Sequence, residues 1–173
     1  KNLNFDNVII TSTSEVYGTA KQIPITEEHP LSAQSPYAAT KIAADQLALS
    51  FYKSFNLPLT ILRPFNTFGP RQSARAIIPT IITQILSKNK NVKLGNLLPT
   101  RDFTYVEDTV EAFISSIKLK PSGEVINIGN KFEISIKELV NIFKNDFNFN
   151  FKVLTDKKRI RPKNSEVFRL LAS

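Results

Sequence analysis

The sequence predicts an α/β fold with a largely parallel sheet. Short apolar runs rich in β-branched residues alternate with longer helical patterns, which is the order of parallel strands joined by helical crossovers. At 173 residues, 42% of them hydrophobic, the chain can bury a packed core. No stretch is long and apolar enough to span a bilayer, and the first residues lack the apolar run of a signal peptide. We therefore expect a cytoplasmic protein without a membrane partner.

The first strand and the first helix have clear local signals. Val8–Ile10 is a β-branched apolar run followed by polar residues, which predicts a buried strand that ends in a loop. Ser35 is suited to cap a helix whose first position is Pro36, where the missing N–H costs nothing. This helix is expected to continue to about Phe55 and to stop at Asn56.

The rest of the chain continues the alternation. Further strands are predicted at Leu59–Leu62, Val92–Leu94, Val125–Ile128 and Phe151–Leu154. Helices are predicted over roughly 77–88, 106–117 and 136–147, and Ser135 with Glu138 forms a capping box at the start of the last one. Loops are predicted at 66–75 and 101–108, and an irregular basic tail closes the chain.

Composition excludes several kinds of site. The chain has no cysteine and a single histidine, His29, so disulfides, thiolate catalysis and a histidine-built metal site are not expected. The net charge of +8 raises the question of nucleic acid. Apart from residues 157–163, however, the basic residues are spread along the chain, and no zinc spacing or aromatic–basic repeat accompanies them. A solvated surface with a few phosphate contacts is the simpler interpretation, and no nucleic-acid partner is predicted.

The glycines do not provide the usual dinucleotide-binding turn. An open parallel sheet commonly binds a dinucleotide through G-x-G-x-x-G after its first strand. No two of the five glycines have that spacing; they are Gly18, Gly69, Gly95, Gly123 and Gly129. Either the fold binds no dinucleotide or the half that binds it is absent. Because methionine is missing even at position 1, a fragment or processed product is the expectation.

A tyrosine and a lysine on one helix carry the first chemical signal. Tyr37 and Lys41 are four residues apart, and so lie on the same helical face. A phenol is ordinarily a poor base near neutral pH, and a neighbouring ammonium group favours its ionised form. Alone, the pair could equally be a surface tyrosine packed on a lysine stem. A catalytic role is favoured over this surface pair by the neighbouring residues Thr13, Ser14 and Glu15. They follow the first strand, at the sheet edge where open α/β sheets bind ligands. Together these residues point to a redox enzyme that acts on a sugar.

Two more polar segments are expected to reach the same region. Residues 63–71, R-P-F-N-T-F-G-P-R, follow the strand after the helix. Residues 101–108, R-D-F-T-Y-V-E-D, contribute Arg101, and a guanidinium is suited to bidentate contact with phosphate.

Together, these segments resemble the extended short-chain dehydrogenase/reductase family of nucleotide-sugar epimerases and dehydratases, from about Val8 to Leu170. T-S-T-S-E-V-Y-G and R-P-K-N-S-E-V are most similar to bacterial N-acetylglucosamine-nucleotide 4,6-dehydratases of the legionaminic-acid type. The resemblance implies the carboxyl-terminal part of a Rossmann-type sheet with the catalytic residues in 1–70. A small substrate-binding domain would lie mainly in 71–173, partly interleaved with the first. The resemblance also implies NAD as cofactor, a nucleotide-diphosphate sugar as substrate and a homodimeric parent.

The resemblance implies catalytic roles for Thr13, Ser14, Glu15, Tyr37 and Lys41. NAD would take a hydride from C4 of the sugar while Tyr37 takes the proton of the 4-hydroxyl group. Lys41 would hold the nicotinamide ribose, and Thr13 would bind the 4-oxygen. Glu15 would then remove the C5 proton as general base, water would leave C6, and the hydride would return there. Ser14 stands where the dTDP-glucose dehydratases carry an aspartate acid. Glu15 would therefore also have to protonate the leaving hydroxyl.

Binding residues follow from the same resemblance. Cofactor contacts are implied for Tyr37 and Lys41 and also for Thr11, Ser12 and Pro64. Substrate contacts are implied for Asn66, Arg71, Arg101, Asn127 and Arg161. Each of these has a structural alternative, as a loop cap for Asn66, a strand-end hydrogen-bonding group for Asn127 and surface charge for Arg71 and Arg161.

The predicted function is a nucleotide-sugar 4,6-dehydratase, present as a partial chain that is inactive alone. A UDP-glucuronate decarboxylase shares the Thr-Ser-Glu triplet and is one alternative, and a 4-epimerase is another. Glu15 favours elimination, because simple 4-epimerases need no base at C5 and generally lack this glutamate. An alternative of a different class is an inactive remnant or a fragment that only binds a partner. The nucleotide, UDP, GDP or dTDP, is left open.

Overall fold

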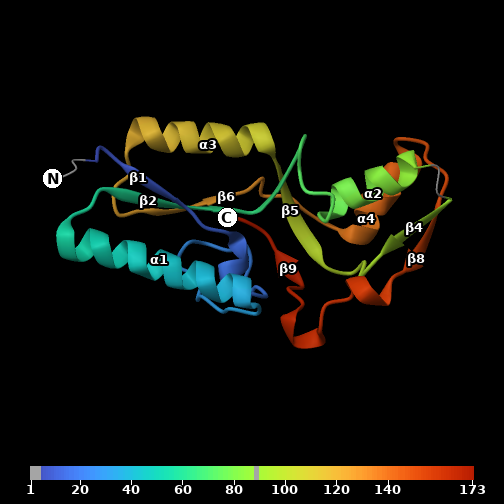
Figure 1. The fold of residues 1–173 in the computed structure, drawn as a ribbon, viewed down its shortest axis with the longest axis horizontal. Coiled ribbons are helices and arrows are strands. Elements are labelled where there is room, and N and C mark those ends of the chain that lie inside the picture. The colour runs from blue at the N-terminus through green and yellow to red at the C-terminus, as the bar shows by residue number, and fades with distance from the viewer. Residues whose placement is uncertain (1–4, 88–89) are drawn as a thin grey trace.

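A parallel three-stranded sheet forms one end of the molecule. A computed structural model describes residues 5–87 and 90–173. Strands β1 (Val8–Thr11), β2 (Leu59–Pro64) and β6 (Val125–Ile128) pair in the order β1-β2-β6, all parallel. Helix α1 (Pro36–Phe55) lies on one side of these strands and α3 (Val106–Leu119) on the other (Figure 1). The predicted α/β fold with parallel strands is therefore confirmed.

Local signals fixed the ends of α1 as predicted. The Ser35 side chain accepts a hydrogen bond from the backbone N–H of Ala38, and Asn56 ends the helix with a left-handed backbone (φ 53°). Strand β1 differs from the prediction in burial. Val8–Ile10 is only half-buried, because β1 is an edge strand of the described sheet, whereas the central strand β2 is buried from Leu59 to Arg63.

The other end of the molecule has its own apolar core. It contains α2 (Ile77–Leu86), α4 (Ile136–Asn145) and the parallel pair of β4 (Asn91–Leu94) and β8 (Lys152–Thr155). Its buried apolar residues come from α2, β4, α4 and the residue before β8: Ile81, Val92, Leu94, Leu139, Val140 and Phe151. The predicted capping box at the start of α4 is confirmed in both directions.

A second sheet connects the two ends. Strand β5 (Thr100–Tyr105) pairs in parallel with β3 (Asn66–Phe68) and β9 (Arg169–Leu170), and antiparallel with β7 (Glu133–Ser135). The predicted loops at 66–75 and 101–108 are therefore wrong where β3 and β5 run. The reason lies in β5, whose two buried side chains, Asp102 and Thr104, are polar and so hide the alternation that predicts a strand.

The remaining corrections are small. Helix α3 continues two residues beyond the predicted end, α4 stops at Asn145, and α2 stops at Leu86, with Lys88 outside the described residues. Short 3₁₀ helices replace parts of predicted loop and tail: η1 (Ser14–Tyr17), η2 (Lys157–Arg159) and η3 (Lys163–Ser165). Among the described residues, no helix has the length and apolar character needed to cross a membrane.

Asp102 joins three segments that are far apart in the sequence. Its side chain is fully buried in β5, and its carboxylate accepts hydrogen bonds from the backbone N–H groups of Asn130, Lys131 and Ala172 at 2.8, 3.1 and 3.2 Å. Gly129 leaves room for this arrangement, because a Cβ there would collide with the Ala172 side chain. Burial raises the pKa of Asp102, and the three N–H donors oppose that rise.

We expect Asp102→Ala to lower the free energy of unfolding by about 2–4 kcal/mol, because it leaves buried N–H groups without an acceptor. Asp102→Asn is the matched control. The asparagine keeps one acceptor oxygen and has no charge to desolvate, so the free energy of unfolding should fall by less than in Asp102→Ala. Urea unfolding of the chain measures both, and an Asp102→Ala variant as stable as the unchanged chain contradicts the role of Asp102.

Candidate functional site

The Thr13–Glu15 segment forms the start of η1, at the carboxyl end of β1. The Thr13 hydroxyl oxygen caps this short helix by accepting a hydrogen bond from the backbone N–H of Glu15 at 3.3 Å. Its hydroxyl hydrogen therefore remains available to a ligand oxygen. Ser14 is buried, whereas the Glu15 carboxylate is partly exposed. Of the two, Glu15 is the group that can reach a ligand.

Tyr37 and Lys41 lie on the first two turns of α1, beside the same strand end. Half of the Tyr37 surface is exposed. The Lys41 ammonium donates a hydrogen bond to the carbonyl oxygen of Thr11, the last residue of β1, at 2.8 Å. This contact brings the tyrosine–lysine face of α1 next to the residues that precede η1. Two ammonium hydrogens of Lys41 are left to hold hydroxyl groups of a ligand.

A basic pocket lies where β3, β5, the start of α2 and the tail meet. The cavity has a volume of about 280 Å³. Four arginines and one carboxylate supply its charge: Arg75, Arg101, Arg159, Arg161 and Glu166. Asn66 and Gln72 also line it, and their side-chain oxygens are buried without a hydrogen-bond partner in the described part of the chain. A ligand with both anionic and hydroxyl groups satisfies this set of donors and acceptors.

Arg101 is the most enclosed of these arginines. Its side chain is 13% exposed, donates to the carbonyl oxygen of Thr100 at 2.7 Å and lies 3.9 Å from the Glu166 carboxylate. Burial lowers the pKa of Arg101, Glu166 raises it and the positive charge of Arg161 lowers it again. A cation that is desolvated and faces a second cation gains from an incoming anion, so these charges favour a phosphate ligand.

Arg161 connects this pocket with the η1 turn. Its guanidinium lines the pocket, and one of its nitrogens lies 3.8 Å from a carboxylate oxygen of Glu15. The two residues are 146 positions apart in the printed sequence, so only the tail folding back across the molecule brings them together. The pocket and the Glu15 carboxylate therefore lie next to each other.

Several of the sequence-predicted residues do not line the basic pocket. Ser12 is buried and donates its hydroxyl hydrogen to Asp45, and Pro64 is half-buried in β2. Asn127 accepts a hydrogen bond from the Tyr17 hydroxyl at 2.7 Å and donates to the carbonyl oxygen of Ile25. Arg71 is exposed in a left-handed conformation (φ 65°) and is not among the residues that line the basic pocket.

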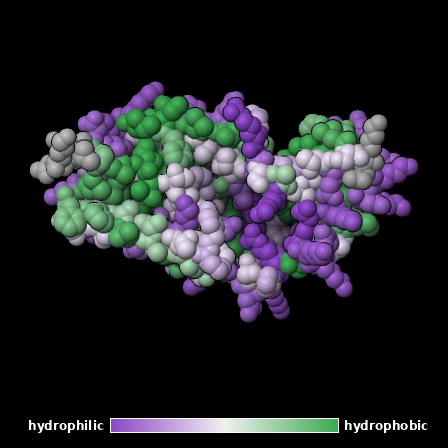
Figure 2. Space-filling model, in the orientation of Figure 1, coloured by the Kyte–Doolittle hydropathy of each residue, from purple (hydrophilic) through white to green (hydrophobic). Residues whose placement is uncertain are grey.

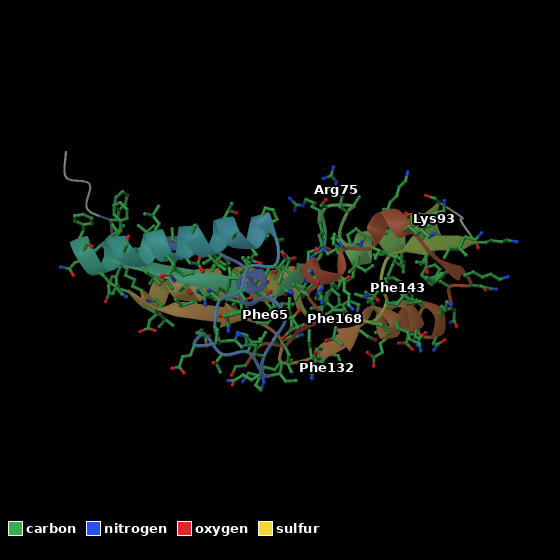
Figure 3. All side chains as sticks on the ribbon, turned by 90° about the horizontal axis from the view of Figure 1, so that it is seen from below. Phe65, Arg75, Lys93, Phe132, Phe143 and Phe168 are labelled. Atoms are coloured by element: carbon green, nitrogen blue, oxygen red, sulfur yellow. The ribbon has the colours of Figure 1, made fainter. Side chains whose placement is uncertain are left out.

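The pocket residues that the sequence does not single out include Gln72, Arg75, Arg159 and Glu166. Arg159 belongs to the basic run 157–163, in which the sequence singles out only Arg161 as a substrate contact. Arg75 lies in the loop ahead of α2, where Figure 3 labels it. One signal in the sequence is Ala76, which cannot cap α2 through its side chain, so the N–H groups of Ile77 and Ile78 have no side-chain cap in the described part of the chain. Figure 2 shows hydrophilic side chains gathered below and beside α2, and hydrophobic ones around α3 and over α2 itself.

The chain is similar to known proteins along nearly its whole length. The family model described as GDP-mannose 4,6 dehydratase matches residues 2–172. The human dTDP-D-glucose 4,6-dehydratase is 36% identical over 143 residues, which cover 80% of this chain and 41% of that protein. The chain therefore spans less than half the length of that relative.

Two solved structures show the same fold. UDP-glucuronic acid 4-epimerase from Bacillus cereus, in complex with UDP-glucuronic acid and NAD, superposes with a TM-score of 0.88 at 30% identity, covering 99% of this chain and 54% of that one. The dTDP-glucose 4,6-dehydratase from Bacillus anthracis, in complex with NAD, gives a TM-score of 0.83 at 32% identity, covering 95% and 52%. With the family match over nearly every residue, they show that this chain belongs to the GDP-mannose 4,6-dehydratase family of extended short-chain dehydrogenases/reductases.

Proposed function

We propose that this chain carries the catalytic residues and the nucleotide-sugar pocket of an NAD-dependent nucleotide-sugar 4,6-dehydratase. The observation that carries the proposal is the contact between Glu15 and Arg161. It joins a partly exposed carboxylate at a strand end to a pocket built for an anion. A sugar attached to a diphosphate in that pocket then lies within reach of a general base.

The basic pocket is proposed to hold the diphosphate. Four guanidinium groups line it, and Arg101 is held between Glu166 and the carbonyl oxygen of Thr100. The free N–H groups at the start of α2 add donors of the kind that bind phosphate. The unpartnered oxygens of Asn66 and Gln72 are suited to accept hydrogen bonds from hydroxyl or N–H groups of the nucleotide.

Residues on α1 and η1 are proposed to carry the oxidation at C4. NAD, when bound, supplies the acceptor for the C4 hydride. Lys41 fits the ribose of that cofactor, because its ammonium is already fixed at the end of β1 through the Thr11 carbonyl. Tyr37 takes the proton of the 4-hydroxyl group, and the free hydroxyl hydrogen of Thr13 binds the 4-oxygen.

Glu15 is proposed to carry the elimination. A ketone at C4 acidifies the C5 proton, and Glu15 removes it as general base. The hydroxyl that leaves C6 needs a proton. Ser14 is buried and is a poor acid, so the proton returns from Glu15. Base and acid are then one residue, whose protonation alternates within each turnover. The reaction would be completed by return of the hydride to C6 and uptake of a proton at C5, which balances the proton that Tyr37 took from the 4-hydroxyl group, so that one water is lost overall.

The finer assignments rest on the sequence. The segments T-S-T-S-E-V-Y-G and R-P-K-N-S-E-V favour an N-acetylglucosamine nucleotide as substrate. We further propose that residues 1–70 belong to the cofactor-binding domain and 71–173 mainly to the substrate domain. Strand β6, from the second segment, pairs with β2 of the first, which supports interleaving. A homodimeric parent is part of the same proposal.

We expect Arg101→Gln to weaken binding of UDP, GDP or dTDP by about 10- to 100-fold, because one charged hydrogen-bonding partner contributes about 1.5–3 kcal/mol. Isothermal titration of the chain measures this for each nucleotide. Arg71→Gln is the matched control, because it removes the same charge outside the pocket and should leave affinity unchanged. If Arg71→Gln weakens nucleotide binding and Arg101→Gln does not, the assignment of the diphosphate to the basic pocket is wrong.

In the protein that joins this chain to its cofactor-binding half, we expect Glu15→Gln to block dehydration and still allow oxidation at C4. The variant should show NADH absorbance without a 4-keto-6-deoxy sugar, because only the C5 proton transfer is lost. Tyr37→Phe should suppress both signals. An undiminished yield of dehydrated sugar from Glu15→Gln, or a C4 epimer as the only product of the unchanged protein, argues against this mechanism.

We expect the 173-residue chain alone to bind no NAD at millimolar concentrations and to be inactive. Lys41 and its neighbours hold one end of the cofactor, and no pair of glycines has the spacing that cradles the pyrophosphate. Calorimetric titration with NAD is the measurement, and titration with UDP is the control for a folded chain. Micromolar affinity for NAD would show that another part of the chain holds the pyrophosphate.

A further inference from the structure

A buried ion pair lies beneath the residues that are proposed to be catalytic. Asp45 on α1 is fully buried, and Arg63 on β2 is 3% exposed. The Nε and one Nη of Arg63 each lie 3.0 Å from Oδ2 of Asp45, and the Ser12 hydroxyl donates to the same oxygen at 2.9 Å. The other oxygen, Oδ1, is buried and has no partner in the described part of the chain. Removing both charges from water costs free energy, which is recovered only when the pair is held in good hydrogen-bonding geometry.

The same guanidinium also holds the far end of η1. The second Nη of Arg63 donates to the Tyr17 hydroxyl at 2.9 Å, and the guanidinium carbon lies 5.1 Å from the centre of the Tyr17 ring. Burial raises the pKa of Tyr17, so the phenol keeps its proton and donates it to Asn127 at 2.7 Å. Arg63 is therefore bonded to α1 on one side and to η1 on the other.

These bonds enclose the candidate catalytic turn. Ser12 comes immediately before Thr13, and Tyr17 is the last residue of η1, so both ends of the segment with Glu15 are held by the Arg63–Asp45 pair. Asp45 is also one helical turn beyond Lys41 and two beyond Tyr37, on the same face of α1. One ion pair thus connects the two elements that carry the proposed acids and bases.

We propose that Asp45 and Arg63 are positioning residues, which hold the Tyr37–Lys41 face of α1 and the Glu15 turn in one fixed relative placement. The inference rests on the proposed function, in which Tyr37 and Glu15 act on neighbouring carbons of one sugar. A misplacement of about 1 Å between reacting groups can cost about 100-fold in rate. Because a buried ion pair contributes little to stability, positioning accounts for its presence better than stability does.

The test replaces the pair without leaving a lone buried charge. Asp45→Asn with Arg63→Gln in one protein removes both charges. Tyr17→Phe keeps the ion pair and removes the Arg63–Tyr17 link to η1, together with the hydrogen bond from Tyr17 to Asn127. Both are made in the protein that joins this chain to its cofactor-binding half. We expect kcat for dehydration to fall about 10- to 100-fold with KM unchanged, because the diphosphate pocket lies outside the network. The matched control is Glu133→Gln, which breaks the Arg169–Glu133 ion pair at the sheet between the two ends. It should change neither kcat nor KM.

A second readout needs no substrate. The backbone N–H groups of Val16 and Gly18 donate to Thr13 and Glu15 within η1, and their hydrogen exchange reports how firmly the turn is held. The double variant and Tyr17→Phe should exchange these hydrogens faster than the unchanged chain, with the interior of α1 unaffected. Folded variants with unchanged exchange, or with unchanged kcat, overturn the positioning role. An unchanged protein that converts no nucleotide sugar contradicts the proposed function instead, and the exchange rates still decide the positioning.

Discussion

The pairing of Arg63 with Asp45 is the interaction on which the arrangement of the site depends. Strand β2 is the central strand of its sheet and is buried almost throughout, so a charged side chain from it needs a partner inside the protein. Asp45 provides that partner from α1. Because the same guanidinium also bonds to Tyr17, the helix, the strand and the η1 turn must pack together in one way.

The basic pocket is built from a different constraint, which is the burial of Asp102 in β5. By accepting three backbone hydrogen bonds, Asp102 holds the residues after β6 and the segment around Ala172 beside β5. The tail between β8 and β9 then has to pass close to the pocket, where it brings Arg159, Arg161 and Glu166. The anion-binding charge is therefore a consequence of where the carboxyl-terminal segment is attached.

Sequence reasoning succeeded where the signal is local. The ends of α1 and the capping box of α4 depend on residues within a few positions of one another, and both were predicted correctly. It failed for β5 and β9, because β5 buries polar side chains and β9 is a two-residue strand recognised only through its partner 69 residues away. In the site, the sequence predicts Glu15, Arg101 and Arg161, whereas no local pattern distinguishes Arg75 and Arg159 from other basic residues. Arg71 and Asn127 have the right residue type but do not line the pocket.

The order of residues alone specifies the alternation of strands and helices, the tyrosine–lysine pair on one helical face and the Thr-Ser-Glu turn at a strand end. These features arise from hydrophobic period, capping and spacing, which act over a few residues. Only the tertiary structure brings the tail arginines to Glu15 and buries Arg63 against Asp45. Such contacts depend on hydrogen bonds and charges between segments that are far apart in the chain. Their geometry is decided when the sheets and helices pack.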